Sequence, residues 1–238
     1  MKHLISTPAI ILALAAAPLA LAVEAPNSPA ANASAQPTLT VIAPPAGEKA
    51  YEIATGDFVD LWTQVTSHSP AVTSPRNLPS SGDVVLIGSD AVNPIVHALI
   101  KRGVLETLDL QYGTDSYRIL SVDAPPVRYL IVAGGCGRST IYAVYDFFRR
   151  QAGAEYFWDG DVIPQRPNLD IGGVDVTEKP HFQYRGLRYF AHRGLHRFQA
   201  EHWDLDDWKR EIDWLLKKRF NLFMLRTGHD DLFQRAFP

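Results

Sequence analysis

A buried strand that leads through a glycine-rich turn into an amphipathic helix is the feature that most constrains this sequence. Val127–Val132 is a short, continuous apolar run, and the glycine-rich segment Gly134–Gly137 follows it closely. From Ser139 onward, apolar residues recur at the spacing of one helix face, and Gly153 lies just past the last turn. The pattern predicts a strand packed against a helix, the unit from which α/β folds are built.

Further strands and helices are expected around this unit. Helical spacing occurs in residues 57–67 and 91–102, whereas residues 83–87, 117–122 and 154–158 have the length and composition of strands. The run at 117–122 is close enough to the next strand to form a hairpin with it. These elements predict a small α/β domain.

The C-terminal residues follow the order strand, helix, strand. Residues 184–190 and 220–225 are strand candidates, and Asp204 is suited to cap a helix over residues 205–219. This order begins a parallel βαβ repeat, and a complete (β/α)8 barrel takes roughly 250 residues. We therefore expect the first strand-helix-strand of a truncated (β/α)8 TIM barrel, after a linker at Pro164–Lys179. The apolar residues expected on the buried face of the helix are Leu205, Trp208, Ile212, Leu215 and Leu216.

Composition and charge exclude several classes of protein. With 46% hydrophobic and 21% charged residues, the chain can bury a core, which excludes wholesale disorder. The formal net charge of −3 leaves no basic surplus for binding nucleic acid. Cys136 is the single cysteine, so an internal disulfide and a multi-cysteine metal site are excluded. A buried structural thiol is the expected role of this residue.

The N-terminal residues are typical of an exported protein. In residues 1–22, Lys2 precedes an apolar run too short to span a membrane, and Ala20-Leu21-Ala22 is a small-x-small cleavage pattern, which predicts a signal peptide. An uncleaved anchor is the alternative. Residues 23–45 are expected to be a disordered linker. Export with one cysteine suits a bacterial periplasm or the exterior, without membrane contact after cleavage.

Three other patterns favour structural roles. The segment Gly134–Thr140 lies where phosphate loops occur, but it lacks the GxxxxGK[ST] and GxGxxG spacings, so a tight strand-to-helix turn is the better interpretation. His192, His196 and His202 lack the HExxH spacing, so no metal or other cofactor is expected. Acidic side chains near the C-terminal helix are expected to cap it or to form its solvated face: Asp204, Asp206, Asp207, Glu211 and Asp213.

Two loops that follow the C-terminal strand candidates carry polar residues suited to binding a polyol. In βα barrels the reactive face is built from loops after the strands. The first loop, Ala191–Trp203, contains three histidines and two arginines, and the second, Arg226–Asp231, contains His229 and Asp230. Trp203 precedes the helix and is placed to stack on a sugar ring. Ordinary loop polarity is the alternative interpretation.

Residues 203–230 carry the most specific motif of the chain. The sequence WDLDDWKREIDW at Trp203–Trp214 continues to Phe220-Asn221-Leu222 and to Thr227-Gly228-His229-Asp230. It resembles the start of the catalytic barrel of glycoside hydrolase family 89, the α-N-acetylglucosaminidases, whose pattern is close to WDWxRWEREIDWMALxGINLxLxxxGQE. Upstream segments resemble the small α/β domain that precedes the barrel in that family and in related hexosaminidases and α-glucuronidases: Arg138–Asp146, Glu155–Trp158 and Val162–Pro164.

The resemblance implies a retaining hydrolase with two glutamates, one acid/base and one nucleophile, about 5–5.5 Å apart on later barrel strands. Both catalytic residues are expected beyond Pro238. Arg188 and Tyr189 match the family's RYY, whereas His192 stands where asparagine is usual, and His229-Asp230 stand where Gln-Glu is usual. The candidate substrate-binding residues are Arg188, Tyr189, His192, Trp203, Gly228, His229 and Asp230.

Together these observations predict the N-terminal fragment of an exported glycoside hydrolase that cleaves terminal α-linked N-acetylglucosamine in the full-length protein and is inactive by itself. The partner would be a carbohydrate such as an amino-sugar glycoside. The alternative is a noncatalytic periplasmic carbohydrate-binding or interaction module. The expected organisation is a signal peptide (1–22), a linker (23–45), an N-terminal α/β domain (46–178) and the incomplete start of a TIM-barrel catalytic domain (179–238).

Overall fold

The main sheet of the computed structural model, which describes residues 39–45, 47–188 and 203–224, has the strand order β2-β1-β3-β5-β4-β8. Strands β1, β2, β3 and β5 pair in parallel, whereas β4 pairs antiparallel with β5 and with β8. The strands are β1 (Thr40–Ile42), β2 (Ala71–Thr73), β3 (Gly82–Ile87), β4 (Tyr117–Ala124), β5 (Val127–Gly134) and β8 (Asp175–Glu178).

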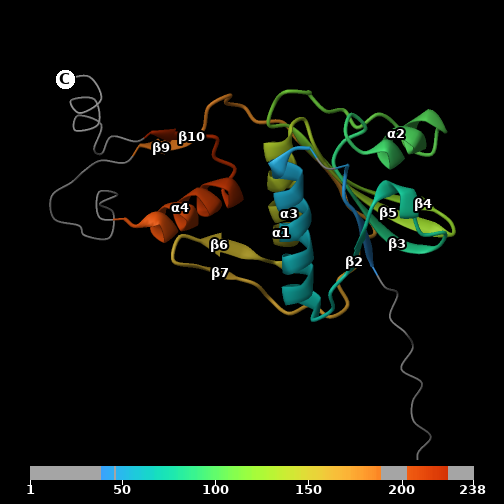
Figure 1. The fold of residues 1–238 in the computed structure, drawn as a ribbon, viewed down its shortest axis with the longest axis horizontal. Helices are drawn as coiled ribbons and strands as arrows, with labels where there is room; N and C mark the ends of the chain where they lie inside the picture. The colour runs from blue at the N-terminus through green and yellow to red at the C-terminus, as the bar shows by residue number, and fades with distance from the viewer. Residues whose placement is uncertain (1–38, 46, 189–202, 225–238) are drawn as a thin grey trace, which may run out of the picture. The chain divides into compact units, whose positions relative to one another are not determined.

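Helices cover both faces of this sheet. On one face α1 (Lys49–Thr66) and α3 (Gly137–Ala152) lie side by side, and α2 (Pro94–Lys101) packs on the other (Figure 1). A short 3₁₀ turn, Pro75–Asn77, precedes β3, and β6 (Glu155–Phe157) forms an antiparallel hairpin with β7 (Gly160–Val162). The predicted mixed α/β fold is therefore confirmed.

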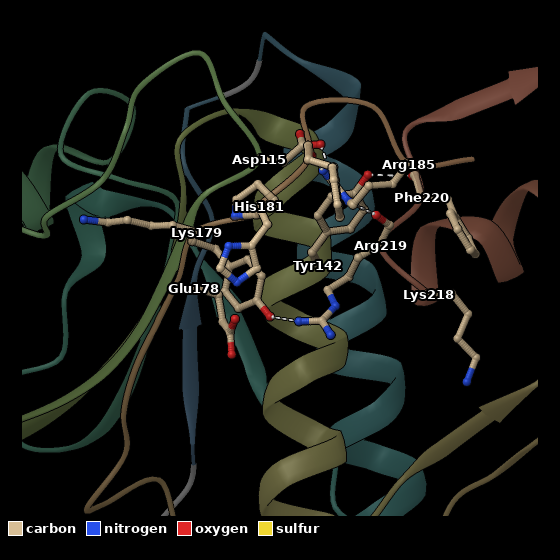
Figure 2. A pocket seen from close by; sticks show the side chains of 12 residues that line it. Asp115, Tyr142, Glu178, Lys179, His181, Arg185, Lys218, Arg219 and Phe220 are labelled. Carbon is tan, nitrogen blue, oxygen red and sulfur yellow. Dashed lines mark hydrogen bonds and ion pairs between the residues drawn. The ribbon is translucent and has the colours of Figure 1, made fainter. Parts of the chain in front are cut away.

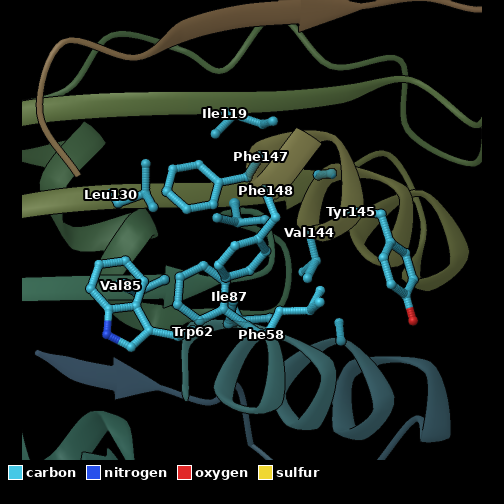
Figure 3. Close-up of a cluster of buried hydrophobic side chains, with 14 of the residues drawn as sticks. Phe58, Trp62, Val85, Ile87, Ile119, Leu130, Val144, Tyr145, Phe147 and Phe148 are labelled. Atoms are coloured by element: carbon cyan, nitrogen blue, oxygen red, sulfur yellow. The ribbon is translucent and has the colours of Figure 1, made fainter. Parts of the chain in front are cut away.

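The alternation of side chains along β3 divides the core between the two faces. Val85 and Ile87 pack with α1 and α3, whereas Val84 and Leu86 pack with α2, because successive strand residues point to opposite faces. Aromatic rings dominate the first of these cores (Figure 3). The Phe58 ring of α1 lies 5.1 Å from that of Phe148 in α3, centroid to centroid.

Most of the predicted elements occur where the patterns placed them. The hairpin is formed by β4 and β5, and Gly153 ends α3 in the left-handed conformation, with φ of 76°. The helix predicted over 57–67 begins earlier, at Lys49, because Tyr51 and Ala54 continue its buried face. The helix predicted over 91–102 begins later, at Pro94, because the Asn93 side chain accepts a hydrogen bond from a backbone N–H and caps it.

Two segments expected to be irregular belong to the sheet. Thr40–Ile42, inside the expected 23–45 linker, forms β1 between β2 and β3, and its residues Val41 and Ile42 are fully buried. The expected linker Pro164–Lys179 was wrong, because it contains β8 and buries Ile171 and Val174. Polar and glycine residues around these short apolar stretches concealed them from pattern analysis.

The predicted C-terminal βαβ unit is confirmed as β9 (Gly186–Arg188), α4 (Leu205–Lys217) and β10 (Leu222–Met224), with β9 and β10 parallel. The predicted buried face of α4 was partly wrong. Leu205 is 68% exposed and Ile212 is 48% exposed, whereas Leu215 is buried. The helix contacts α3 and β6, so its buried face is set by the domain before it as well as by its own strands.

The expected signal peptide and residues 23–38 of the expected linker lie outside the described residues. The described residues fall within one compact unit. Within the described ranges, no helix combines the length and the apolar character needed to cross a membrane.

Candidate functional site

Two of the predicted substrate-binding residues, Arg188 and Trp203, lie within the described residues. Arg188 at the end of β9 is the register partner of Met224 at the end of β10, so these parallel strands end at the same edge. Trp203, just before α4, packs its ring edge-on against Trp208, with 4.8 Å between ring centroids. The other candidates lie outside the described residues: Tyr189, His192, Gly228, His229 and Asp230.

The opposite edge of the same strands is joined to the α/β domain by a buried carboxylate that the sequence analysis missed. The Asp115 side chain, before β4, is 3% exposed. It accepts hydrogen bonds from Arg138 Nη2 at 2.7 Å, from Arg185 Nη2 at 2.7 Å and from Asn221 Nδ2 at 2.6 Å. Figure 2 shows Asp115 beside Arg185. Arg185 immediately precedes β9 and Asn221 immediately precedes β10, so one carboxylate holds the start of both strands.

These partners keep Asp115 ionised. Burial alone would raise the pKa of this carboxyl, but hydrogen bonds from Arg185, Arg138 and Asn221 hold the pKa below its usual value. Asn221 also accepts a hydrogen bond from the backbone N–H of Arg185 through Oδ1, at 2.8 Å. The motif Phe220-Asn221-Leu222 contained the one available signal in the sequence, a polar side chain immediately before a strand.

A second polar network lies beside the first. Arg219 Nη1 donates to the Tyr117 hydroxyl at 2.8 Å, and this hydroxyl donates to Asp146 Oδ2 at 3.0 Å. Asp146 is also bound by Arg149 and Arg150, each at 2.7 Å. Burial opposes ionisation of Asp146, but these two arginines lower its pKa overall. The network ties α3 to the turn between α4 and β10.

A cavity of about 300 Å³ opens between these networks. Tyr142 of α3 forms part of its wall and donates a hydrogen bond to the Phe220 carbonyl at 2.7 Å. Burial raises the pKa of the Tyr142 hydroxyl, so it is a neutral donor at physiological pH. Figure 2 shows His181 and Glu178 on one side of Tyr142, and Arg219 and Phe220 on the other. A smaller cavity of about 220 Å³ shares Tyr142 and Arg219 with the first.

Glu211 does not lie on a solvated face, contrary to the expectation. It is 3% exposed and accepts a hydrogen bond from the Trp158 indole N–H at 2.5 Å, which joins α4 to the β6–β7 hairpin. Burial raises the pKa of this carboxyl, and the indole hydrogen bond lowers it by less. The sequence could not show the burial of Glu211, because the β6–β7 hairpin covers that face of α4 only in the folded protein.

The glycine-rich segment is the tight turn that the sequence predicted. A Cβ atom at Gly134 would lie 2.3 Å from the Thr140 backbone nitrogen, and one at Gly135 would lie 2.3 Å from the Gln111 carbonyl oxygen. A Cβ at Gly137 would lie 2.2 Å from Glu48 Oε1, so an acidic side chain occupies the space at the start of α3. Cys136 is half-buried, with Sγ 3.7 Å from Asp115 Oδ1.

Comparisons with known proteins point to glycoside hydrolases. No family model matches the chain. Human α-N-acetylglucosaminidase is 27% identical to it over 125 residues, which are 52% of this chain and 16% of the human protein. The structure of a family GH115 4-O-methyl-α-glucuronidase with specificity for decorated arabinogalactans matches with a TM-score of 0.55 and 15% identity, over 78% of this chain and 24% of that one.

A GH138 enzyme targeting pectin rhamnogalacturonan II matches with a TM-score of 0.42 and 13% identity, over 81% of this chain and 24% of that one. The GH115 match shows a shared fold: the chain is folded like part of a glycoside hydrolase. These matches do not single out family 89. The chain spans about a sixth of the human relative and about a quarter of the GH115 structure.

Proposed function

We propose that these residues are the amino-terminal part of an exported glycoside hydrolase of the α-N-acetylglucosaminidase type. In the full-length protein, two glutamates on later barrel strands would cleave terminal α-linked N-acetylglucosamine with retention of configuration. The observation that carries the proposal is the parallel β9–α4–β10 unit in the segment whose motif resembles family 89. The sequence similarity to human α-N-acetylglucosaminidase supports the same choice of substrate.

The proposal assigns a role to each edge of β9 and β10. Arg188 and the candidates in the two following loops would contact the sugar, because barrel enzymes react at the carboxyl ends of their strands. Asp115, Arg185 and Asn221 would hold the amino ends of the same strands. Trp203 would stack on a sugar ring, and its edge-to-face contact with Trp208 would hold the indole in place.

A noncatalytic carbohydrate-binding module is the second candidate. The observation in its favour is that the βαβ unit is docked on the α/β domain through a buried carboxylate and through the Glu211–Trp158 hydrogen bond. Such docking gives the unit stabilising contacts without further barrel strands. With either function the protein would be exported. Detection of a processed N-terminus near Ala22 in the extracytoplasmic fraction would test this export.

The gene beyond codon 238 distinguishes the two candidates. The hydrolase proposal expects an in-frame continuation of several hundred codons with two suitably placed glutamates. The encoded full-length protein should release the aglycone from an aryl α-N-acetylglucosaminide, and substitution of either glutamate by glutamine should abolish release. Purified residues 23–238 should show no turnover above the buffer background. A stop codon after Pro238, or full-length protein that cleaves only an aryl α-glucuronide, would overturn the proposed activity.

A further inference from the structure

Arg219 is a half-buried cation for which the described part of the chain provides no ion-pair partner. Its side chain donates a hydrogen bond to a neutral group, the Tyr117 hydroxyl, at 2.8 Å. The nearest carboxylates are already bound elsewhere: Asp146 by Arg149 and Arg150, and Glu178 by Arg150. Buried or partly buried charges are normally paired, so this guanidinium has donors to spare for an anion.

The surroundings of Arg219 are those of a small-molecule site. The guanidinium borders both cavities, of about 300 and about 220 Å³, and the larger one reaches the lower size limit of typical ligand pockets. Tyr142 lines both cavities but is 1% exposed, with its hydroxyl bound to the Phe220 carbonyl, whereas Phe182 at the larger cavity is 73% exposed. In Figure 2 the Arg219 side chain points down beside Tyr142 towards the Tyr117 hydroxyl, whereas Lys218 points away. Aromatic faces beside hydroxyls and a cation suit a hydroxylated ring that carries a negative charge.

The backbone of Arg219 belongs to the C-terminal turn of α4. Its φ is 63°, the left-handed conformation in which many helices end, and the N–H groups of Arg219 and Phe220 donate to the carbonyls of Leu216 and Leu215. This turn fixes where the Arg219 side chain leaves the helix, beside the two cavities.

This position is separate from the proposed catalytic edge. Residues 218–220 and Arg185 precede β10 and β9, so the cavities lie at the amino ends of the strands, whereas the candidate substrate residues follow the carboxyl ends. Three residues of strand rise about 10 Å. A ligand at Arg219 would therefore contact the junction of the α/β domain with the βαβ unit.

We propose that Arg219 and the aromatic side chains of the larger cavity form a second ligand site, which binds a monosaccharide-sized molecule whose ring carries an oxyanion, either a carboxylate or a phosphate ester. Arg219 binds the oxyanion through its unused N–H donors, and Phe182 and Phe220 pack against the ring. The site does not depend on glycosidase activity, because the described residues that line the two cavities include none of the candidate substrate residues.

Calorimetric titration of the purified chain at constant ionic strength tests the site with three ring probes: glucuronate, glucose 6-phosphate and glucose. Glucuronate and glucose differ at the carboxylate, and glucose 6-phosphate distinguishes an ester from an acid. Inorganic phosphate serves as the ring-free anion. We expect at least one anionic sugar to bind at least tenfold more tightly than both glucose and inorganic phosphate, tenfold being about 1.4 kcal/mol. The wild-type protein alone can overturn the proposal: it does so if charged and neutral sugars bind equally, or if no anion binds.

Substitutions locate the binding. Arg219→Gln should weaken the anionic sugar at least tenfold, and Arg219→Lys, which keeps the charge, should restore part of that loss. Arg210→Gln is the matched control, because it removes the same charge from a side chain of α4 that is 71% exposed and lines neither cavity. Equal weakening by both glutamine variants would show non-specific attraction and would contradict the assignment.

Discussion

Asp115→Asn is the substitution that should most directly separate the βαβ unit from the α/β domain. The carboxylate is 3% exposed and accepts four hydrogen bonds from nitrogen donors, two from Arg138, one from Arg185 and one from Asn221. An asparagine keeps the shape but presents one acceptor oxygen and an amide N–H₂ to the same donors. Two guanidinium groups then lose their counter-charge at the start of β9.

The structure sets the size of the expected loss. Removing one partner of a buried ion pair costs about 3–5 kcal/mol. Arg138 is 45% exposed, so water can hydrate its guanidinium when the carboxylate is lost. Arg185 is 19% exposed, so its guanidinium is much less accessible to water. We therefore expect the lower end, about 3 kcal/mol of unfolding free energy. For a chain of this size, that corresponds to a Tm about 6–12 °C lower.

Urea unfolding followed by tryptophan fluorescence measures this change. Trp158, Trp208 and Trp214 report on α4 and the hairpin beside it, whereas Trp62 reports on the core under α1. The variant should lose the first signal at lower urea than the second. Asp206→Asn is the matched control, because Asp206 is 80% exposed and its pair with Lys209 should contribute only about 0–1 kcal/mol.

The effect of Asp115 also has a defined pH dependence. Its folded-state pKa lies below the unfolded value, which is about 3.9 for aspartate. The stabilisation is therefore fully present above that pH and is lost as the pH falls through the folded-state pKa. Wild type and Asp115→Asn should converge in stability in strong acid. A variant that unfolds at the same urea concentration as Asp206→Asn at neutral pH would refute the role given to Asp115.

Three further substitutions test the packing. Glu211→Gln should leave Tm at neutral pH unchanged or higher, because it removes a buried charge and keeps an oxygen for the Trp158 indole. Only the wild type should lose stability as the pH rises through the raised pKa of Glu211, and thermal scans at mildly acidic and neutral pH would measure this difference. Gly135→Ala should abolish the soluble fold, since its Cβ would lie 2.3 Å from a carbonyl oxygen. Gly56→Ala in α1 is its control, because the added Cβ meets no atom within 4 Å and should raise stability by about 0.5–1 kcal/mol. Circular dichroism and the yield of soluble protein distinguish the two variants. Phe58→Ala should cost about 3–5 kcal/mol in urea unfolding, because this ring is fully buried among other aromatic rings, and a loss below about 1 kcal/mol would contradict the packing of α1 on α3.

The local periodicity of the sequence determined the elements with a strong pattern. The hairpin of β4 with β5, the helix α3 with its terminal Gly153 and the capped helix α4 could all be predicted, because spacing and capping residues act within a few neighbours. The sequence also determined that β9 and β10 would be parallel, since a helix connects them. Motif comparison located the candidate substrate residues at the carboxyl end of β9 and in the loops that follow the two strands.

Tertiary structure alone decided which polar residues are buried and which apolar ones are not. Thr40–Ile42 and Asp175–Glu178 became strands because neighbouring strands offered them hydrogen-bond partners, although neither segment has a pattern of its own. Glu211 is buried and Ile212 exposed because α4 turns one face to α3 and the β6–β7 hairpin. Asp115, Arg185 and Asn221 are far apart in sequence, and only the docking of the βαβ unit brings their charges and hydrogen bonds into one buried cluster.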